Sequence, residues 1–351
     1  AGTFIEVQTL EWLRQVVGYD FRTLDGYRSA GDLGGLVTSG GQMSNHISLL
    51  LALNERYPVF RRSGLRGIDV APRVLLAGDL THYSFLTAVH ALGLGADAIV
   101  SLPANEKSRL DVHSLDASID SLNQDEEAFI VVGVAGNTKT SQFDDLRSIN
   151  RWAKSRGLWF HVDACHGGSL IFSHKYRYLL EGIEEADSIA LDPHKGLFLP
   201  YPLSVLLVKD RGVLARLSRK PDAAARDGSL DLGQVTPFSG SRGLEVMKLW
   251  SVIKMLGSNG LGEVVDSRQE LAEFAYSQVA NSELFCVFHD FEFYRICFNF
   301  FPQSLRGACA ATMKSSQFKA VVDDLTAVLS KRAYEDGVFC FDSFPLLDIE
   351  N

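Results

Sequence analysis

The fold is decided by two short runs, Leu158-Trp159-Phe160-His161-Val162-Asp163 and Ser188-Ile189-Ala190-Leu191-Asp192, the second of which leads into Pro193-His194-Lys195-Gly196. Both runs are rich in aliphatic or aromatic residues, and a helix-sized segment separates them. This pattern is typical of two buried strands of an α/β sheet. Each run ends in polar residues, and ligands bind at the C-terminal edge of such a sheet. We therefore expect Asp163 and Lys195 to face one site.

A lysine and an aspartate that approach one ligand point to pyridoxal phosphate (PLP). The lysine amine forms a Schiff base with the aldehyde of PLP, and the protonated ring then draws electrons from the Cα of a bound amino acid. A carboxylate beside the pyridine nitrogen keeps that nitrogen protonated, because a nearby opposite charge favours the charged form. For isolated residues, a solvated Lys195 and an Asp163 that caps the next helix are the commoner outcome, so other motifs must decide.

Length, composition and charge exclude several classes of protein. The 351 residues suffice for one large domain and a smaller one. The hydrophobic fraction of 46% and the charged fraction of 22% are ordinary for a globular protein. A formal net charge of -9 argues against a nucleic-acid partner. No apolar run approaches the roughly 20 residues that span a bilayer, so we expect no membrane partner.

The cysteines form neither a metal motif nor a disulfide framework. They are odd in number, scattered along the chain, and contain no Cys-x-x-Cys pair. This usage favours a reducing compartment, so we expect a cytoplasmic protein without a bound metal. The residues are Cys165, Cys286, Cys297, Cys309 and Cys340.

Three further segments fall at turns where the predicted ligand edge lies. A Ser/Gly turn containing Gly41 and Gln42 opens a helix, and the N–H groups of such a turn suit a phosphate. His82 follows a predicted strand over 73–78, where its imidazole can stack on a planar cofactor or simply cap a helix. Thr138 lies in the loop after a predicted strand over 128–134, and its hydroxyl can bond a cofactor or make a turn.

The remaining pattern predicts three parts. A helix is expected over 1–20, a large domain over 21–260 and a small domain over 261–351. Apolar residues alternate with polar ones over 294–300, which indicates a half-buried strand. An amphipathic helix over 318–329 and a short strand over 338–341 complete an α+β domain.

In this order, the motifs resemble the group II PLP-dependent amino acid decarboxylases, which include glutamate, aromatic amino acid and diaminobutyrate decarboxylases. The resemblance covers most of the chain and implies PLP fold type I, the aspartate aminotransferase-like fold. That fold is a mostly parallel sheet flanked by helices, and the family works as homodimers on amino acid substrates. The motifs are TSGGQMSNH (38–46), THYS (81–84), GNTKTSQFDDL (136–146), LWFHVDACHGGS (158–169), ADSIALDPHKG (186–196) and SGSRGLEVMKLW (239–250).

The resemblance also implies roles for individual residues. Lys195 would hold PLP as a Schiff base, Asp163 would pair with the pyridine nitrogen, and His82 would stack on the ring. These three form the predicted catalytic set. The other predicted cofactor-binding residues are Gly41, Gln42, Thr138, Cys165, Asp192 and His194, and the candidates for the substrate or the partner's site are His166, Ser241 and Arg242.

The chain departs from the family pattern at informative places. After the aspartate, the family commonly has Ala-Ala or Ala-Ala-Tyr, where this chain has Ala164-Cys165-His166. No Tyr occurs between Tyr201 and Tyr276, where many relatives carry the acid that protonates Cα. The family's terminal parts are longer than those of this chain, which leaves the substrate open.

Three readings of function therefore stand. Decarboxylation of an L-amino acid to its amine leads. Another PLP reaction at the same site, such as decarboxylation with oxidative deamination or an elimination, is the runner-up, and a non-catalytic PLP-fold partner protein comes third. A nucleotide-binding α/β protein would need a Gly-x-Gly-x-x-Gly or Walker loop, and neither is present.

Overall fold

The computed structural model describes residues 2–217, 232–238, 243–300 and 316–337. Contacts between residues divide the chain into two compact units, 1–138 with 142–266 and 139–141 with 267–351. The sequence-based division at residues 20 and 260 stays a prediction beside this grouping. Each unit is described by itself below.

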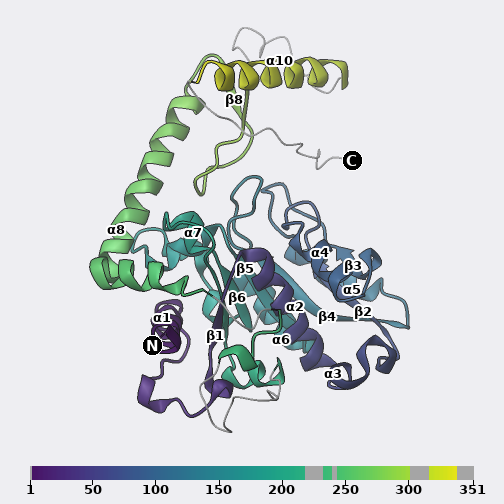
Figure 1. The fold of residues 1–351 in the computed structure, drawn as a ribbon. Coiled ribbons are helices and arrows are strands. Elements are labelled where there is room, and N and C mark those ends of the chain that lie inside the picture. Colours follow the sequence, from purple (N-terminus) through teal and green to yellow (C-terminus); the bar gives the residue numbers. More distant parts are fainter. Residues whose placement is uncertain (1, 218–231, 239–242, 301–315, 338–351) are drawn as a thin grey trace. The chain divides into compact units, whose positions relative to one another are not determined.

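A seven-stranded sheet forms the centre of the first unit, in the order β1-β7-β6-β5-β4-β2-β3 (Figure 1). Only β7 runs antiparallel to its neighbours in this sheet, so the predicted mostly parallel α/β sheet is confirmed. The strands are β1 (Gly35–Thr38), β2 (Ala71–Leu76), β3 (Ile99–Ser101), β4 (Glu126–Val134), β5 (Trp159–Ala164), β6 (Ser188–Leu191) and β7 (Ser204–Val208). The pattern analysis did not anticipate β1, because its four residues merge with the glycine turn that follows.

Helices flank this sheet, and two of them, α2 (Gly41–Arg56) and α7 (Pro193–Gly196), begin shortly after the strands β1 and β6. Within the part of the chain that the structure describes, no helix combines the length and apolar character needed to cross a membrane. The helices of the first unit are α1 (Gly2–Val17), α2 (Gly41–Arg56), α3 (Phe60–Ser63), α4 (Ser84–Ala91), α5 (Leu115–Asp120), α6 (Leu146–Arg156), α7 (Pro193–Gly196) and the first part of α8 (Val246–Ala280). Gly257, with φ of 66°, interrupts the helical backbone inside α8.

The core lies on both faces of the central strands. Every residue of β6 and β7 is buried, as their continuous apolar runs predict. Helix α2 packs against β6 and β7, and its Ile47 and Leu51 join Leu206 and Val208 of β7 in one hydrophobic cluster. This packing fixes the N-terminal end of α2 at the sheet edge where the strands end.

Strand register brings the polar ends of the central strands together. Val134 lies opposite Asp163 across β4 and β5, and Asp163 lies opposite Ala190 across β5 and β6. Asp192 directly follows β6 and precedes α7, which carries Lys195. The two predicted key residues thus sit on neighbouring elements at the same edge.

The second unit is a small α+β arrangement. Strands β8 (Phe285–Val287) and β9 (Phe298–Phe300) pair antiparallel, and the unit also contains α10 (Ser316–Glu335). The predicted strand over 294–300 is longer than β9. The Cys297 amide donates to His289 Nε2 at 3.0 Å, so it is bonded within the loop instead of in a strand ladder. The strand predicted over 338–341 lies outside the described residues.

The buried face of β7 offers a test of the core. We expect Leu206→Ala to lower the free energy of unfolding by about 2–5 kcal/mol, because it leaves a cavity where the side chain is fully buried. Leu86→Ala is the matched control, since Leu86 on α4 is 43% exposed, and its change should stay within about 0.5 kcal/mol. Urea unfolding measures both values, and equal losses would contradict this account of the core.

Candidate active site

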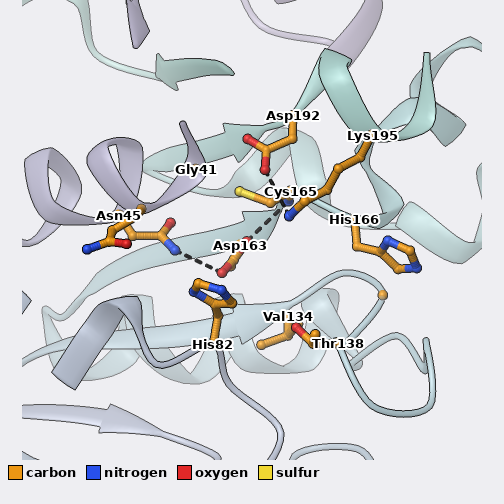
Figure 2. Close-up of a pocket in the computed structure, with 12 residues that line it drawn as sticks. Gly41, Asn45, His82, Val134, Thr138, Asp163, Cys165, His166, Asp192 and Lys195 are labelled. Atoms are coloured by element: carbon orange, nitrogen blue, oxygen red, sulfur yellow. Dashed lines mark hydrogen bonds and ion pairs between the residues drawn. The ribbon is translucent and has the colours of Figure 1, made fainter. Parts of the chain in front are cut away.

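A pocket lies at the C-terminal ends of β4, β5 and β6 (Figure 2). It draws its walls from the start of α2, the turn before α4, the loop after β4, the end of β5 and α7. It brings together most of the residues that the sequence predicts for the site. The lining residues are Gly41, Gln42, Asn45, His82, Val134, Gly136, Thr138, Asp163, Cys165, His166, Asp192 and Lys195.

Asp163 is the buried acid of the pocket. Its Oδ2 accepts a hydrogen bond from Asn45 Nδ2 at 2.9 Å, and its Oδ1 accepts one from the Cys165 amide at 3.1 Å. Burial by itself raises the pKa of Asp163, whereas a charge on His161 would lower it; the hydrogen bonds donated by Cys165 and Asn45 also lower this pKa, which lies below its ordinary value. The carboxylate is therefore held ionised inside the protein.

Lys195 reaches the pocket from α7 and contacts a second carboxylate. Its Nζ lies 2.9 Å from Asp192 Oδ2, while Asp192 Oδ1 accepts a hydrogen bond from Ser204 Oγ. Burial is the largest single effect and lowers the pKa of Lys195, but the charge and hydrogen bond of Asp192, together with the neighbouring acidic groups Cys165 and Asp163, outweigh burial and leave the pKa raised. The Lys195 amine is therefore protonated while the negative charge of Asp192 lies beside it.

His82 presents a planar ring beside Asp163, as Figure 2 shows. Its Nδ1 accepts a hydrogen bond from the Ser84 amide at 3.2 Å, so the proton of the neutral ring lies on Nε2. Burial is the main cause that lowers the pKa of His82, against the raising effect of Asp163. His82 is therefore a neutral, partly buried ring.

The start of α2 lies very close to the pocket floor. A Cβ on Gly41 would lie 2.3 Å from Cys165 Sγ and 2.8 Å from Asp192 Oδ2, which no side chain tolerates. The N–H groups of a helix's first turn have no intrahelical acceptor, and Gly41 and Gln42 belong to that turn of the 16-residue helix α2. Burial raises the pKa of the Cys165 thiol, so this sulfur stays protonated.

His194 is the predicted site residue with a described position that does not line the pocket. The His194 side chain is only 3% exposed and lies beside the Tyr201 ring, and its Nδ1 lies 2.5 Å from the Leu203 carbonyl oxygen. Its contact with a phosphate stays a prediction. Ser241 and Arg242 lie outside the described residues, so their role at a partner's site also stays a prediction.

Asn45, Val134 and Gly136 line the pocket but were not singled out from the sequence. Asn45 lies one helical turn after Gly41, and this spacing places both on the same side of α2. The same reasoning applies to His161, which lies two residues before Asp163 on β5 and so shares its face. The spacing of these residues in the sequence places them on the same face as Gly41 or Asp163. The sequence does not show that their polar groups are buried, which is what makes them important.

Comparison with known proteins identifies the family. A family model described as the pyridoxal-dependent decarboxylase conserved domain matches residues 1–301. The chain belongs to the pyridoxal-dependent decarboxylase family. Cysteine sulfinic acid decarboxylases from Mus musculus and Homo sapiens are similar to it, each 31% identical over 341 residues and 95% of this chain. The chain spans 66% of the length of these relatives.

Solved structures agree with this family assignment. The apo form of mouse CSAD matches 98% of this chain and 70% of its own, with a TM-score of 0.87 and 30% identity. Oryza sativa TDC with PLP and tryptamine matches 96% of this chain and 68% of its own, with a TM-score of 0.80 and 24% identity. The second likeness shows the fold alone. The predicted fold type I architecture is confirmed.

The pocket of this decarboxylase-family chain fits PLP by the chemistry of its side chains. An amine on Lys195, a buried ionised carboxylate on Asp163 and the planar ring of His82 surround one space. The side-chain-free Gly41 keeps the start of α2 close to that space. These groups match the aldehyde, pyridine nitrogen, ring face and phosphate of PLP respectively.

The close approach at Gly41 predicts a position-specific effect. We expect Gly41→Ala to lower the free energy of unfolding by about 1–3 kcal/mol through overpacking, and to weaken PLP binding. Gly40→Ala is the matched control, because a Cβ there meets nothing within 4 Å. Urea unfolding and PLP titration provide the two measurements. Equal losses in the two variants would show that the close packing at Gly41 is not important.

The Asp192–Lys195 pair predicts a pH effect on cofactor capture. Only the neutral amine attacks an aldehyde, so PLP incorporation should rise as pH increases through the raised pKa of Lys195. Asp192→Asn removes the charge that raises this pKa, so the profile should move to lower pH. Ser204→Ala keeps the charge and removes one hydrogen bond, so its profile should stay near that of the wild type. Borohydride trapping at several pH values measures the rates, and an unmoved Asp192→Asn profile would contradict the pairing.

Proposed function

We propose that this chain is a PLP-dependent carboxy-lyase that converts an L-amino acid to its amine and carbon dioxide. One observation carries the proposal: the Lys195 amine, the Asp163 carboxylate and the His82 ring line the same pocket. The family membership of the chain supports the same reaction class. The chain spans 66% of the length of its curated relatives, so the activity of the whole relatives is extended to this chain as part of the proposal.

The side chains divide the work of the reaction. When bound, PLP supplies an aldehyde that takes up an amine and a protonated ring that accepts the electron pair released at Cα. Lys195 holds the cofactor and yields to the substrate amine. Asp163 retains the proton at the pyridine nitrogen, because a buried carboxylate stabilises a neighbouring cation strongly. His82 covers the ring face and keeps water from it.

After carbon dioxide leaves, the Cα of the substrate must take up one proton to give the amine. The chain offers the Lys195 amine, the Nε2–H of His82 and the His166 imidazole at the pocket as proton donors. A proton from one of these groups gives the amine product. Cysteine sulfinic acid is the first substrate to test, because proteins named for its decarboxylation are 31% identical to this chain.

A spectroscopic experiment tests the proposal. The protein with PLP should show an absorbance band near the visible edge that borohydride abolishes, because the Lys195 amine has bonded the aldehyde. Lys195→Ala should lose the band, whereas Lys209→Ala should keep it, since Lys209 forms an ion pair with Glu185 at 3.2 Å outside the pocket. A folded wild-type protein without the band would support a non-catalytic partner protein instead.

The product distinguishes the second candidate reaction. No Tyr occurs over 202–275, which favours a test for decarboxylation with oxidative deamination. Each L-amino acid that shifts the absorbance band is assayed for carbon dioxide, amine, ammonia and oxygen uptake. Amine without oxygen uptake supports the carboxy-lyase, and aldehyde with ammonia and oxygen uptake replaces it.

Assembly and location are further parts of this proposal. A homodimer is supported by the likeness of segment 239–250 to the family segment that reaches a partner's site, and light scattering of the purified protein would test it. A cytoplasmic location is supported by the cysteines, of which Cys165, Cys286 and Cys297 are unpaired. Imaging of the tagged full-length protein would test this location.

A further inference from the structure

A continuous chain of buried polar side chains runs from the interior of the sheet to Asp163. Asn45 Nδ2 lies 2.9 Å from Asp163 Oδ2, and Asn45 Oδ1 lies 3.0 Å from His161 Nε2. His161 Nδ1 then lies 2.8 Å from Ser188 Oγ. Ser188 Oγ is also 2.8 Å from Trp159 Nε1 and 3.0 Å from Ser48 Oγ. None of the roles assigned so far explains this chain of hydrogen-bonded side chains.

The orientation of the Asn45 amide fixes the direction of the whole chain. A carboxylate accepts hydrogen bonds only, so the Asn45 group that faces Asp163 is its NH₂. The second hydrogen of this NH₂ is donated to Ser84 Oγ at 2.9 Å. Both donors of the amide are then used, and Asn45 Oδ1 must accept from His161 Nε2.

His161 is thereby assigned its tautomer. Its Nε2 carries the proton, so the neutral ring accepts at Nδ1, and the Ser188 hydroxyl donates to it. Ser188 Oγ then accepts from Trp159 Nε1 and Ser48 Oγ, which uses both of its lone pairs. An imidazolium at His161 would instead donate at Nδ1, and the Ser188 hydroxyl would then have to donate to Ser48 Oγ, which reverses the direction of that hydrogen bond. Burial, which lowers the pKa of His161 to about 4, agrees with the neutral ring.

Every hydrogen bond of the chain therefore points toward Asp163. Aligned hydrogen bonds polarise one another in a medium of low dielectric, and the last donor becomes a stronger partner for the carboxylate. The members are nearly inaccessible to water, so no solvent competes with this effect. The chain supplies stabilisation to the anion without placing a second charge beside it.

We propose that Asn45 and His161 are positioning residues that hold the Asp163 carboxylate ionised and oriented toward the pyridine nitrogen of PLP. This inference rests on the proposed function. Neither residue lies at the reacting atoms, since both act through Asp163. Substituting either should weaken cofactor binding in a way that depends on pH.

The other titratable groups around Asp163 are the same in wild type and variants. They lie directly after β5, in the turn before α4, and on and before α7. These groups are Cys165, His82, Lys195 and Asp192, besides His161 itself. A difference between wild type and an Asn45 variant in the pH dependence of cofactor binding therefore reports on the lost hydrogen bond to Asp163.

Pyridoxamine phosphate is the probe, because it has no aldehyde and so binds without reacting with Lys195. Loss of the donated hydrogen bond raises the pKa of Asp163, so Asn45→Ala should bind the probe progressively less as pH falls. Because the pKa of Asp163 lies below its ordinary value in the wild type, this extra loss of affinity should appear only below about pH 5 and approach about tenfold at the lower end, as a shift of one pKa unit gives. His161→Phe should change in the same direction.

Asn54→Ala is the matched control. Asn54 is a buried residue of the same helix, but its Nδ2 bonds the Leu50 carbonyl oxygen at 2.7 Å within α2. The Asn54→Ala variant should also be less stable, because it loses a buried side-chain hydrogen bond, but the pH dependence of its affinity for the probe should match that of the wild type. A folded Asn45→Ala with the wild-type profile would overturn the inference and leave the proposed function standing. Failure of the wild type to bind either the probe or PLP would overturn both.

The wild-type protein allows a second test that does not depend on a variant's folding. Nitrogen NMR of labelled histidine, with the His161 signal assigned through His161→Phe, reports which ring nitrogen carries the proton. The expected result near neutral pH is a protonated Nε2 and an unprotonated Nδ1. The opposite tautomer or an imidazolium would overturn the proposed direction of the chain.

Discussion

The structure around the pocket depends on one constraint, the burial of an ionised carboxylate at Asp163. Moving a carboxylate out of water costs several kcal/mol unless its oxygens receive hydrogen bonds. The Asp163 oxygens receive them from Asn45 and from the Cys165 amide. The position of α2 against β6 and β7 is what brings Asn45 to that carboxylate. Hydrophobic packing of one helix therefore decides the charge state of a group on the neighbouring sheet.

A second carboxylate in the same pocket has a different task. Asp192 pairs with the Lys195 amine, so the local charges of that pair cancel. Asp163 has no such cation among the described groups that bond it, and its negative charge remains available to a ligand. The distinction follows from position, since Asp192 precedes the helix that carries Lys195 whereas Asp163 lies on the neighbouring strand. Under the proposed function, Asp192 acts through Lys195 at the aldehyde of PLP, and Asp163 acts at its pyridine nitrogen.

Much of this arrangement could be predicted from the sequence, because short apolar runs ending in Asp163 and Asp192 define strands whose ends must meet at one edge. The strand β1 was missed, since four residues beside a glycine turn give too short a pattern. The alternation over 294–300 overstated β9, because one loop amide is bonded to the His289 ring. Asn45 and His161 were missed for a different reason. Their importance comes from contacts between α2 and β5, which are far apart in sequence and which no local pattern encodes.

The use of neutral donors at Asp163 follows from the chemistry that the site must perform. A lysine or arginine bonded to this carboxylate would stabilise it more simply, but its positive charge would repel the proton on the pyridine nitrogen. Neutral dipoles lower the cost of burying the anion while leaving its full charge to attract that proton. The same reasoning requires His161 to remain uncharged, because an imidazolium two residues away would act as a competing cation. The burial of His161 on β5 therefore belongs to the electrostatic design of the cofactor site as much as to the core.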